Sequence, residues 1–96
     1  MLTIFAEKRT KLGKSASRLL RKNNKFPSII YGLDIVPVYI EINQDAFINM
    51  MSIPDFNKKK IIIQLDNNVQ YHVKIKDLQN HAFKRKILHI DFFVQK

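Results

Sequence analysis

His89 and Asp91 stand two residues apart near the end of the chain, so on a β-strand both side chains point to one face. A histidine beside a carboxylate can act as an acid–base pair, and Ser17 would then be the candidate nucleophile. The sequence has no Gly-x-Ser-x-Gly elbow and nothing that indicates an oxyanion hole, so we predict no catalytic residue and no enzyme activity. The same pair also offers a hydrogen-bond donor and an acceptor, which can distinguish base edges in the wide minor groove of RNA.

Ligands for metals and cofactors are scarce. The chain contains no cysteine, and its three histidines, His72, His81 and His89, match no metal-binding spacing. Its two glycines are too few for a phosphate-binding loop. We therefore expect no metal site and no cofactor in the protein, apart from Mg²⁺ that a bound RNA would hold.

A basic segment near the N-terminus dominates the charge pattern. Between Lys8 and Lys25 there are eight Lys or Arg residues and no Asp or Glu. A solvated surface helix is the alternative interpretation, but such a helix usually interleaves both signs of charge. Crowded like charges are unfavourable unless a polyanion neutralises them, so the segment favours a nucleic-acid partner. On a helix that starts at Lys14, one face would gather the cations Lys14, Arg18, Arg21 and Lys25, with Lys22 beside them.

The opposite face of this helix is apolar. Ala16, Leu19 and Leu20 lie there, and we expect them to dock on the rest of the protein because so short a helix is not stable alone. Ser15 is the predicted N-cap, and Asn23-Asn24 the predicted stop.

Composition agrees with this interpretation. The 96 residues are 46% hydrophobic and carry a net charge of +9, which is typical of a small folded nucleic-acid binder. We predict a single domain over residues 1–96. The absence of cysteine fits a reducing compartment, the N-terminus does not look like a signal peptide, and no apolar run approaches the roughly 18 residues of a membrane span. These observations predict a cytoplasmic protein without a membrane partner.

Alternation of apolar and polar residues predicts six strands, and two further segments read as helices. The predicted fold is therefore mainly β with two helices, arranged as a small six-stranded antiparallel β-barrel that is closed or nearly closed. Phe47, Ile48 and Met51 are the predicted buried stripe of the second helix, and the segment 77–85 is expected to be irregular. The strands are expected at 2–8, 26–31, 35–42, 58–65, 69–75 and 87–94, the first helix from Lys14 onward to the stop at Asn23-Asn24, and the second helix at 44–52.

Charge is uneven along this plan. From Leu33 to Asn57 there is no Lys or Arg, and there are four acids. Since a barrel can bring its first and last strands together, we predict one cationic face built from both termini, with the middle of the chain turned away.

Three separated blocks of this sequence resemble a known family. They are Gly13-Lys-Ser-Ala-Ser-Arg18, Asn24-Lys-Phe-Pro-Ser-Ile-Ile-Tyr-Gly32, and His81 followed by Leu88-His-Ile-Asp-Phe92. In this order they closely resemble the bacterial large-subunit ribosomal proteins that bind 5S ribosomal RNA, a family related to a general stress protein. The resemblance implies a six-stranded β-barrel similar to the anticodon-binding domain of glutaminyl-tRNA synthetase.

The resemblance also implies a partner and a set of contacts. The partner would be 5S ribosomal RNA, bound on the minor-groove side of its loop E helix. Neighbouring components of the large ribosomal subunit would also contact the protein, which is expected to be monomeric when free. The residues carried over by matching position are Arg9, Lys14, Ser17, Arg18, Arg21, Tyr31, Gln79, His89 and Asp91. Two lysines are added to this set of predicted RNA contacts. They are Lys22, from the cationic helix face, and Lys76, although relatives often carry Gln at the position of Lys76.

Two departures and two alternatives belong to this prediction. Ala82 follows His81 where the family usually has Pro, which is expected to loosen that loop, and Leu19 replaces a frequent Arg. One alternative is a tRNA- or anticodon-binding accessory domain, and the other is a general interaction module for acidic proteins.

Overall fold

The predicted number of strands and helices is confirmed, and one 3₁₀ turn is added to them. A computed structural model describes residues 1–9 and 13–95, so part of the basic loop, 10–12, lies outside the described residues. In chain order the elements are β1 (Leu2–Lys8), α1 (Lys14–Lys22), β2 (Lys25–Gly32), β3 (Ile35–Asn43), α2 (Gln44–Met51), η1 (Phe56–Lys58), β4 (Ile61–Leu65), β5 (Gln70–Asn80) and β6 (Ile87–Val94).

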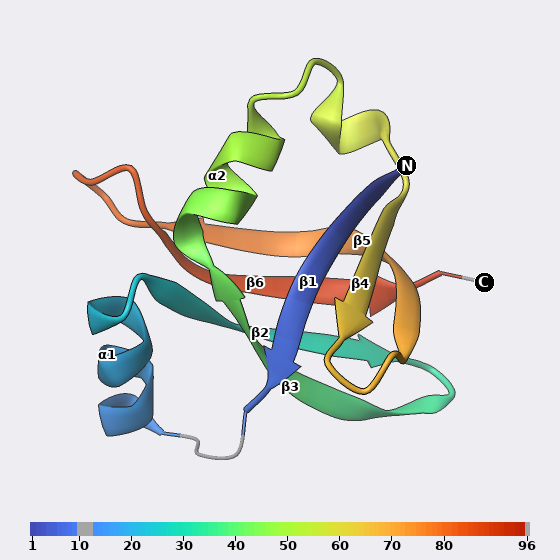
Figure 1. Cartoon of the computed structure of the whole chain (residues 1–96), viewed down its shortest axis with the longest axis horizontal. Helices are drawn as coiled ribbons and strands as arrows, with labels where there is room; N and C mark the ends of the chain where they lie inside the picture. The colour runs from blue at the N-terminus through green and yellow to red at the C-terminus, as the bar shows by residue number, and fades with distance from the viewer. Residues whose placement is uncertain (10–12, 96) are drawn as a thin grey trace.

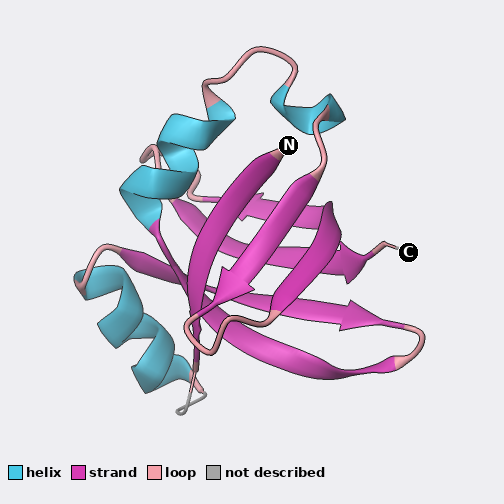
Figure 2. Cartoon of the chain, turned by 45° about the vertical axis from the view of Figure 1, so that its right-hand side comes forward, coloured by secondary structure: helices cyan, strands magenta, loops and turns pink. Residues whose placement is uncertain are grey.

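The six strands close into a barrel in the order β1-β3-β2-β6-β5-β4 (Figures 1 and 2). The predicted six-stranded barrel is confirmed, but not all of its pairings are antiparallel. The strands β1 and β4 run parallel, as do β2 and β6, whereas the other four pairs are antiparallel. Strand alternation alone cannot distinguish the two senses of pairing, because a side chain alternates between faces in both.

Two strand boundaries differ from the prediction by more than one residue. β4 begins at Ile61 rather than Lys58, because Lys58 is the last residue of the 3₁₀ turn η1. β5 continues to Asn80, through the first part of the segment that was predicted to be irregular. A register shift between Ile75 and Asp77 interrupts the alternation there. Because the end of the strand was predicted from alternating apolar and polar residues, this β-bulge made the strand look shorter than it is.

Aromatic and branched side chains fill the barrel. Ile90 and Phe92 of β6 are fully buried, and α2 closes one end of the barrel with Phe47, which is also buried (Figure 1). The ring of Phe47 makes edge contacts with Phe26 at 5.6 Å and with Phe92 at 6.5 Å between ring centroids. Met51, at the end of the same helix, is 37% exposed, so its predicted burial is wrong.

The closed order of strands also separates the two ends of the chain. β1 pairs with β3 and β4, whereas β6 pairs with β2 and β5, so the first and last strands lie across the barrel from each other. The prediction that they come together in one cationic face is therefore wrong. Among the described residues, no helix has the length and apolarity needed to cross a membrane.

Candidate nucleic-acid interface

The helix α1 is the basic element of the candidate interface. It begins at Lys14 with Gly13 as N-cap, whose φ of 110° suits glycine, and no side chain caps it, so the predicted cap at Ser15 is wrong. The amide of Ser17 donates to the Gly13 carbonyl at 3.0 Å and starts the helical ladder. The predicted stop is confirmed, because the amide of Asn23 donates back to the Leu19 carbonyl at 3.1 Å.

The cations of α1 are exposed and no acid shares the helix with them. No residue of α1 is buried, and Leu19 is 58% exposed, so the apolar face docks less completely than predicted. Ala16 and Leu20 are half-buried, as is Ser17. The helix thus rests lightly on the barrel and presents its charge outward. The exposed cations are Lys14, Arg18, Arg21 and Lys22.

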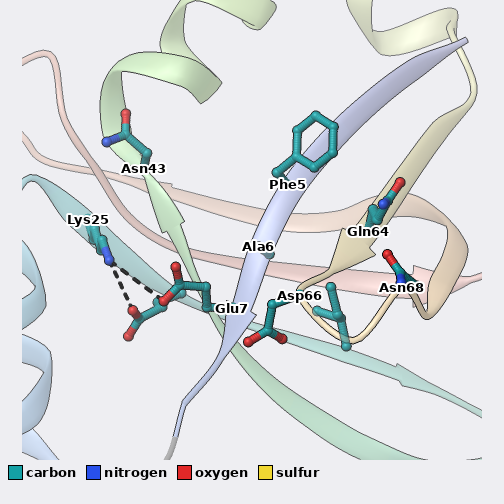
Figure 3. Close-up of a pocket in the computed structure, with 10 residues that line it drawn as sticks. Phe5, Ala6, Glu7, Lys25, Asn43, Gln64, Asp66 and Asn68 are labelled. Carbon is teal, nitrogen blue, oxygen red and sulfur yellow. Dashed lines mark hydrogen bonds and ion pairs between the residues drawn. The ribbon is translucent and has the colours of Figure 1, made fainter.

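Lys25 does not belong to this cationic face, contrary to the prediction. It lies on β2 after the end of the helix, and its ammonium group stands between two carboxylates, 3.1 Å from Glu41 and 4.0 Å from Glu7 (Figure 3). The hydrogen bond to Glu41 raises the pKa of Lys25 above its usual value, against the opposing effect of burial. Lys25 is therefore occupied within the protein.

Figure 3 shows the hollow beside this ion pair, a cavity of about 380 Å³ lined mainly by residues of β1, β3, β4 and the turn after β4. Three acids, Glu7, Glu41 and Asp66, line it, and none of the predicted RNA-binding residues does. This cavity is unsuited to a polyanion, so we do not place the interface there.

Arg9 follows β1 and lies near α1. Its amide donates to the carbonyl of Tyr39 at 2.9 Å, and its side chain lines a cavity of about 290 Å³ together with Leu19 and Leu20. One guanidinium nitrogen, Nη2, is buried without a hydrogen-bond partner within the described part of the chain. A buried donor without a partner is costly, so this guanidinium still has hydrogen-bonding capacity to satisfy.

The outward face of β2, β6 and β5, here called the strand face, holds the remaining predicted residues. His89 of β6 pairs in register with Gln79 of β5, and Asp91 pairs with Asp77. Residues that face each other across antiparallel strands share one side of the sheet, so the structure brings Gln79, His89 and Asp91 together as the resemblance implies. Lys76 is exposed and lies in the β-bulge of β5, beside this face.

His89 and Asp91 are joined directly. The histidine Nε2 lies 2.6 Å from the Oδ1 of Asp91, and both side chains are about one-third exposed. A carboxylate only accepts hydrogen bonds, so Nε2 carries the hydrogen, and in a neutral ring Nδ1 is the acceptor. The prediction treated the histidine as the donor for a ligand. In the structure Nε2 is occupied by Asp91, which leaves Nδ1 and the second carboxylate oxygen for a ligand.

Tyr31 ends β2 next to this pair and is supported by a residue that the sequence analysis assigned no role. Its ring meets that of Phe93 edge to face, with 5.4 Å between centroids and 86° between planes. The ammonium of Lys74, on the neighbouring strand β5, lies 5.9 Å from the centroid of the Phe93 ring. Phe93 is the outward neighbour of Asp91 on the same strand, so alternation identifies its outward face, whereas its contact with Tyr31 depends on the parallel pairing of β2 with β6.

Two buried polar side chains, both missed by the sequence analysis, fix the position of β6. The hydroxyl of Ser28 donates to the Ile90 carbonyl at 2.5 Å. The side-chain amide of Gln44 makes two hydrogen bonds to the backbone of Ile87. Its nitrogen donates to the Ile87 carbonyl at 2.5 Å, and its oxygen accepts from the Ile87 N–H at 3.1 Å. Gln44 is only 2% exposed and belongs to α2, so the helix that closes the barrel also anchors the strand that carries His89 and Asp91.

The interface therefore has two parts that β2 connects. α1 leads directly into β2, and β2 pairs in parallel with β6 from Ser28 to Tyr31. No group of three or more potential metal ligands occurs in the described part of the chain.

Comparison with known proteins identifies the family. The model of the ribosomal L25p family matches residues 4–92. The chain is 54% identical over 93 residues to the large ribosomal subunit protein bL25 of Buchnera aphidicola subsp. Baizongia pistaciae, covering 96% of this chain and 95% of that protein. It is 46% and 44% identical to the bL25 proteins of Klebsiella pneumoniae (strain 342) and Cronobacter sakazakii, each over 96% of this chain and 97% of the relative. On these matches, which run almost from end to end, the chain belongs to the ribosomal L25p family.

Proposed function

We propose that this protein is a structural, non-catalytic constituent of the large ribosomal subunit that binds 5S ribosomal RNA. The names of its relatives, large ribosomal subunit proteins, support the first part of the proposal. The second part rests on the blocks Gly13–Arg18, Asn24–Gly32 and Leu88–Phe92, which resemble the 5S-binding proteins. Its place would then be on the ribosome in the cytoplasm.

The observation that carries the proposal is the junction of α1 with the strand face through β2. α1 presents cations without acids, and the strand face presents a preformed set of polar and aromatic groups beside it. Phosphate contacts position a protein on a nucleic acid, whereas contacts to base edges provide selectivity. The two parts of the interface divide these two tasks between them.

Each part has groups suited to its task. Arg18 and Arg21 can hold phosphates through two N–H groups at once, whereas Lys14 and Lys22 act as point charges. On the strand face, Asp91 can accept from an amino group of a base in the wide, shallow minor groove of an RNA helix. Tyr31 and Gln79 flank it, and Mg²⁺ would be held by the RNA rather than by the protein.

A binding titration tests the proposal. The protein is titrated with 5S ribosomal RNA, a tRNA and an RNA duplex of similar length, at low and at near-physiological salt with Mg²⁺. Specific recognition predicts that 5S RNA stays bound at the higher salt while the duplex dissociates. Parallel weakening of all three RNAs would contradict the proposal, and tighter binding of tRNA would favour the tRNA-binding alternative.

Asp91→Ala tests the reading of bases. We expect the variant to lose preference for 5S RNA over duplex by about 5- to 150-fold, since a good contact to a base edge contributes about 1–3 kcal/mol of discrimination. The dependence of binding on salt should change little. Asp77→Ala is the matched control. Asp77 lies directly opposite Asp91, so this substitution removes the same charge from the strand face. Equal loss of preference in both variants would show that charge alone, and not the position of Asp91, matters.

A further inference from the structure

The loop that joins β5 to β6, residues 81–86, combines an exposed aromatic ring with a run of cations. Phe83 is 95% exposed, more than any other large hydrophobic residue in the described part of the chain. Lys84, Arg85 and Lys86 follow it directly and are all exposed. No acid occurs between Asp77 and Asp91, so the charge of this loop is not balanced locally.

Hydrogen bonds within the loop hold it in shape. The amide of His81 donates to the Lys86 carbonyl at 2.8 Å and closes the base of the loop. The Nδ1 atom of His81 accepts from the amides of Phe83 and Lys84, each at 3.1 Å. The Phe83 ring contacts only the His81 ring among the described aromatic residues, edge-on at 6.4 Å. The loop therefore presents Phe83 outward instead of burying it.

The base of the loop is tied to the core. Ile87, the first residue of β6, is 2% exposed and is held by both hydrogen bonds of Gln44. A loop that is ordered before its ligand arrives loses less conformational entropy on binding. Figure 1 shows this loop and α1 as separate projections from the same end of the barrel, so one large ligand can reach both.

We propose that the 81–86 loop is a second RNA contact, in which Phe83 stacks on an unpaired base while Lys84, Arg85 and Lys86 bind the flanking phosphates. An exposed aromatic ring beside cations matches a nucleotide, which offers a flat base and an anionic phosphate in one unit. The bases of a continuous duplex are already stacked on one another, so the ring requires a bulge, a loop or an end. This inference rests on the proposed function in that the ligand is RNA, but it does not depend on the RNA being 5S.

The test uses a short RNA hairpin with one unpaired 2-aminopurine, and the same hairpin fully paired. Phe83→Ala in the full-length protein should weaken binding of the bulged hairpin about tenfold or more and abolish the quenching of 2-aminopurine fluorescence that stacking causes. Binding of the paired hairpin should not change. Phe83→Tyr should retain both affinity and quenching, because it keeps the ring. Leu33→Ala is the matched control, since Leu33 is 92% exposed and lies in the turn between β2 and β3.

Two results would overturn the inference. They are unchanged binding of the bulged hairpin by Phe83→Ala, or an equal loss of affinity for the bulged and the paired hairpins. The two titrations can reject this inference and the proposed function independently of each other. A loss of 5S preference in the first titration with the Phe83 effect intact would reject 5S recognition and keep the loop contact. A preserved 5S preference without any Phe83 effect would do the reverse.

Discussion

The helix α1 and the strand β6 both carry predicted RNA-binding residues, but the protein holds them in different ways. α1 has no buried residue and no capping side chain, and its exposed cations share the helix with no acid. β6 buries Ile90 and Phe92 in the core and is fixed by Ser28 and Gln44, and its outward His89 and Asp91 hold each other. A phosphate attracts a cation from many directions, so α1 does not need a rigid position, whereas a base edge requires donors and acceptors at fixed points.

The largest expected effect comes from breaking the anchor of β6. Gln44→Ala removes both bonds to Ile87 and leaves a buried N–H and a buried carbonyl without partners, which is expected to lower the free energy of unfolding by about 2–4 kcal/mol. Urea unfolding measures this loss. Gln64→Ala is the matched control, because the side-chain oxygen of Gln64 accepts a surface hydrogen bond from the side chain of Gln70, and the loss of stability should stay below about 0.5 kcal/mol. Equal losses in the two variants would contradict the anchoring role.

The same variant separates the two regions in function. At a temperature where Gln44→Ala is still folded, we expect the preference for 5S RNA to fall while non-specific binding through α1 persists. A variant that keeps its full preference would show that the strand face does not depend on this anchor.

The contrast between the two regions also explains what could be predicted from the sequence. The bounds of β1 and β6 were predicted correctly, because each strand places apolar residues at alternate positions in the core, such as Ile4 and Ala6 in β1 and Ile90 and Phe92 in β6. The same alternation placed His89 and Asp91 on one face. It could not reveal their direct contact, because side-chain conformation is not encoded in the spacing of residues along a strand.

What could not be predicted depends on contacts between distant parts of the chain. The buried role of Gln44 requires Ile87, which lies 43 residues away, and a helix pattern gives no reason to bury a glutamine. Lys25 was assigned to the cationic face because its partners, Glu7 and Glu41, approach it only in the folded barrel. The bulge at Ile75–Asp77 hid the end of β5, and with it the strand position of Gln79.

An intermediate effect is expected from the charges of α1. Arg18→Ala should weaken 5S RNA binding by about 1–3 kcal/mol if the guanidinium makes a bidentate contact, and should lower the slope of log affinity against log salt by about 1. Stability should not change, because Arg18 is exposed and no residue of α1 is buried. Binding isotherms at several salt concentrations measure both quantities, with Leu19→Ala as an uncharged control on the same helix. Unchanged affinity in the folded variant would remove Arg18 from the interface.

The smallest effect is expected at Lys25, a cation that belongs neither to the exposed face of α1 nor to the strand face. Its pKa is raised in the folded state by Glu41, so its contribution to stability is present below the unfolded pKa of about 10.5 and is lost as the pH rises through the higher folded value. Lys25→Met should therefore lower the free energy of unfolding by about 0.2–1 kcal/mol at pH 7, with a difference that shrinks above about pH 10.5. Lys22→Met, on the exposed side of α1, should do the opposite, leaving stability intact and reducing RNA affinity and its salt dependence. Urea unfolding across this pH range distinguishes the two lysines, and a Lys25→Met difference that stays constant through the alkaline range would show that the ion pair does not stabilise the fold.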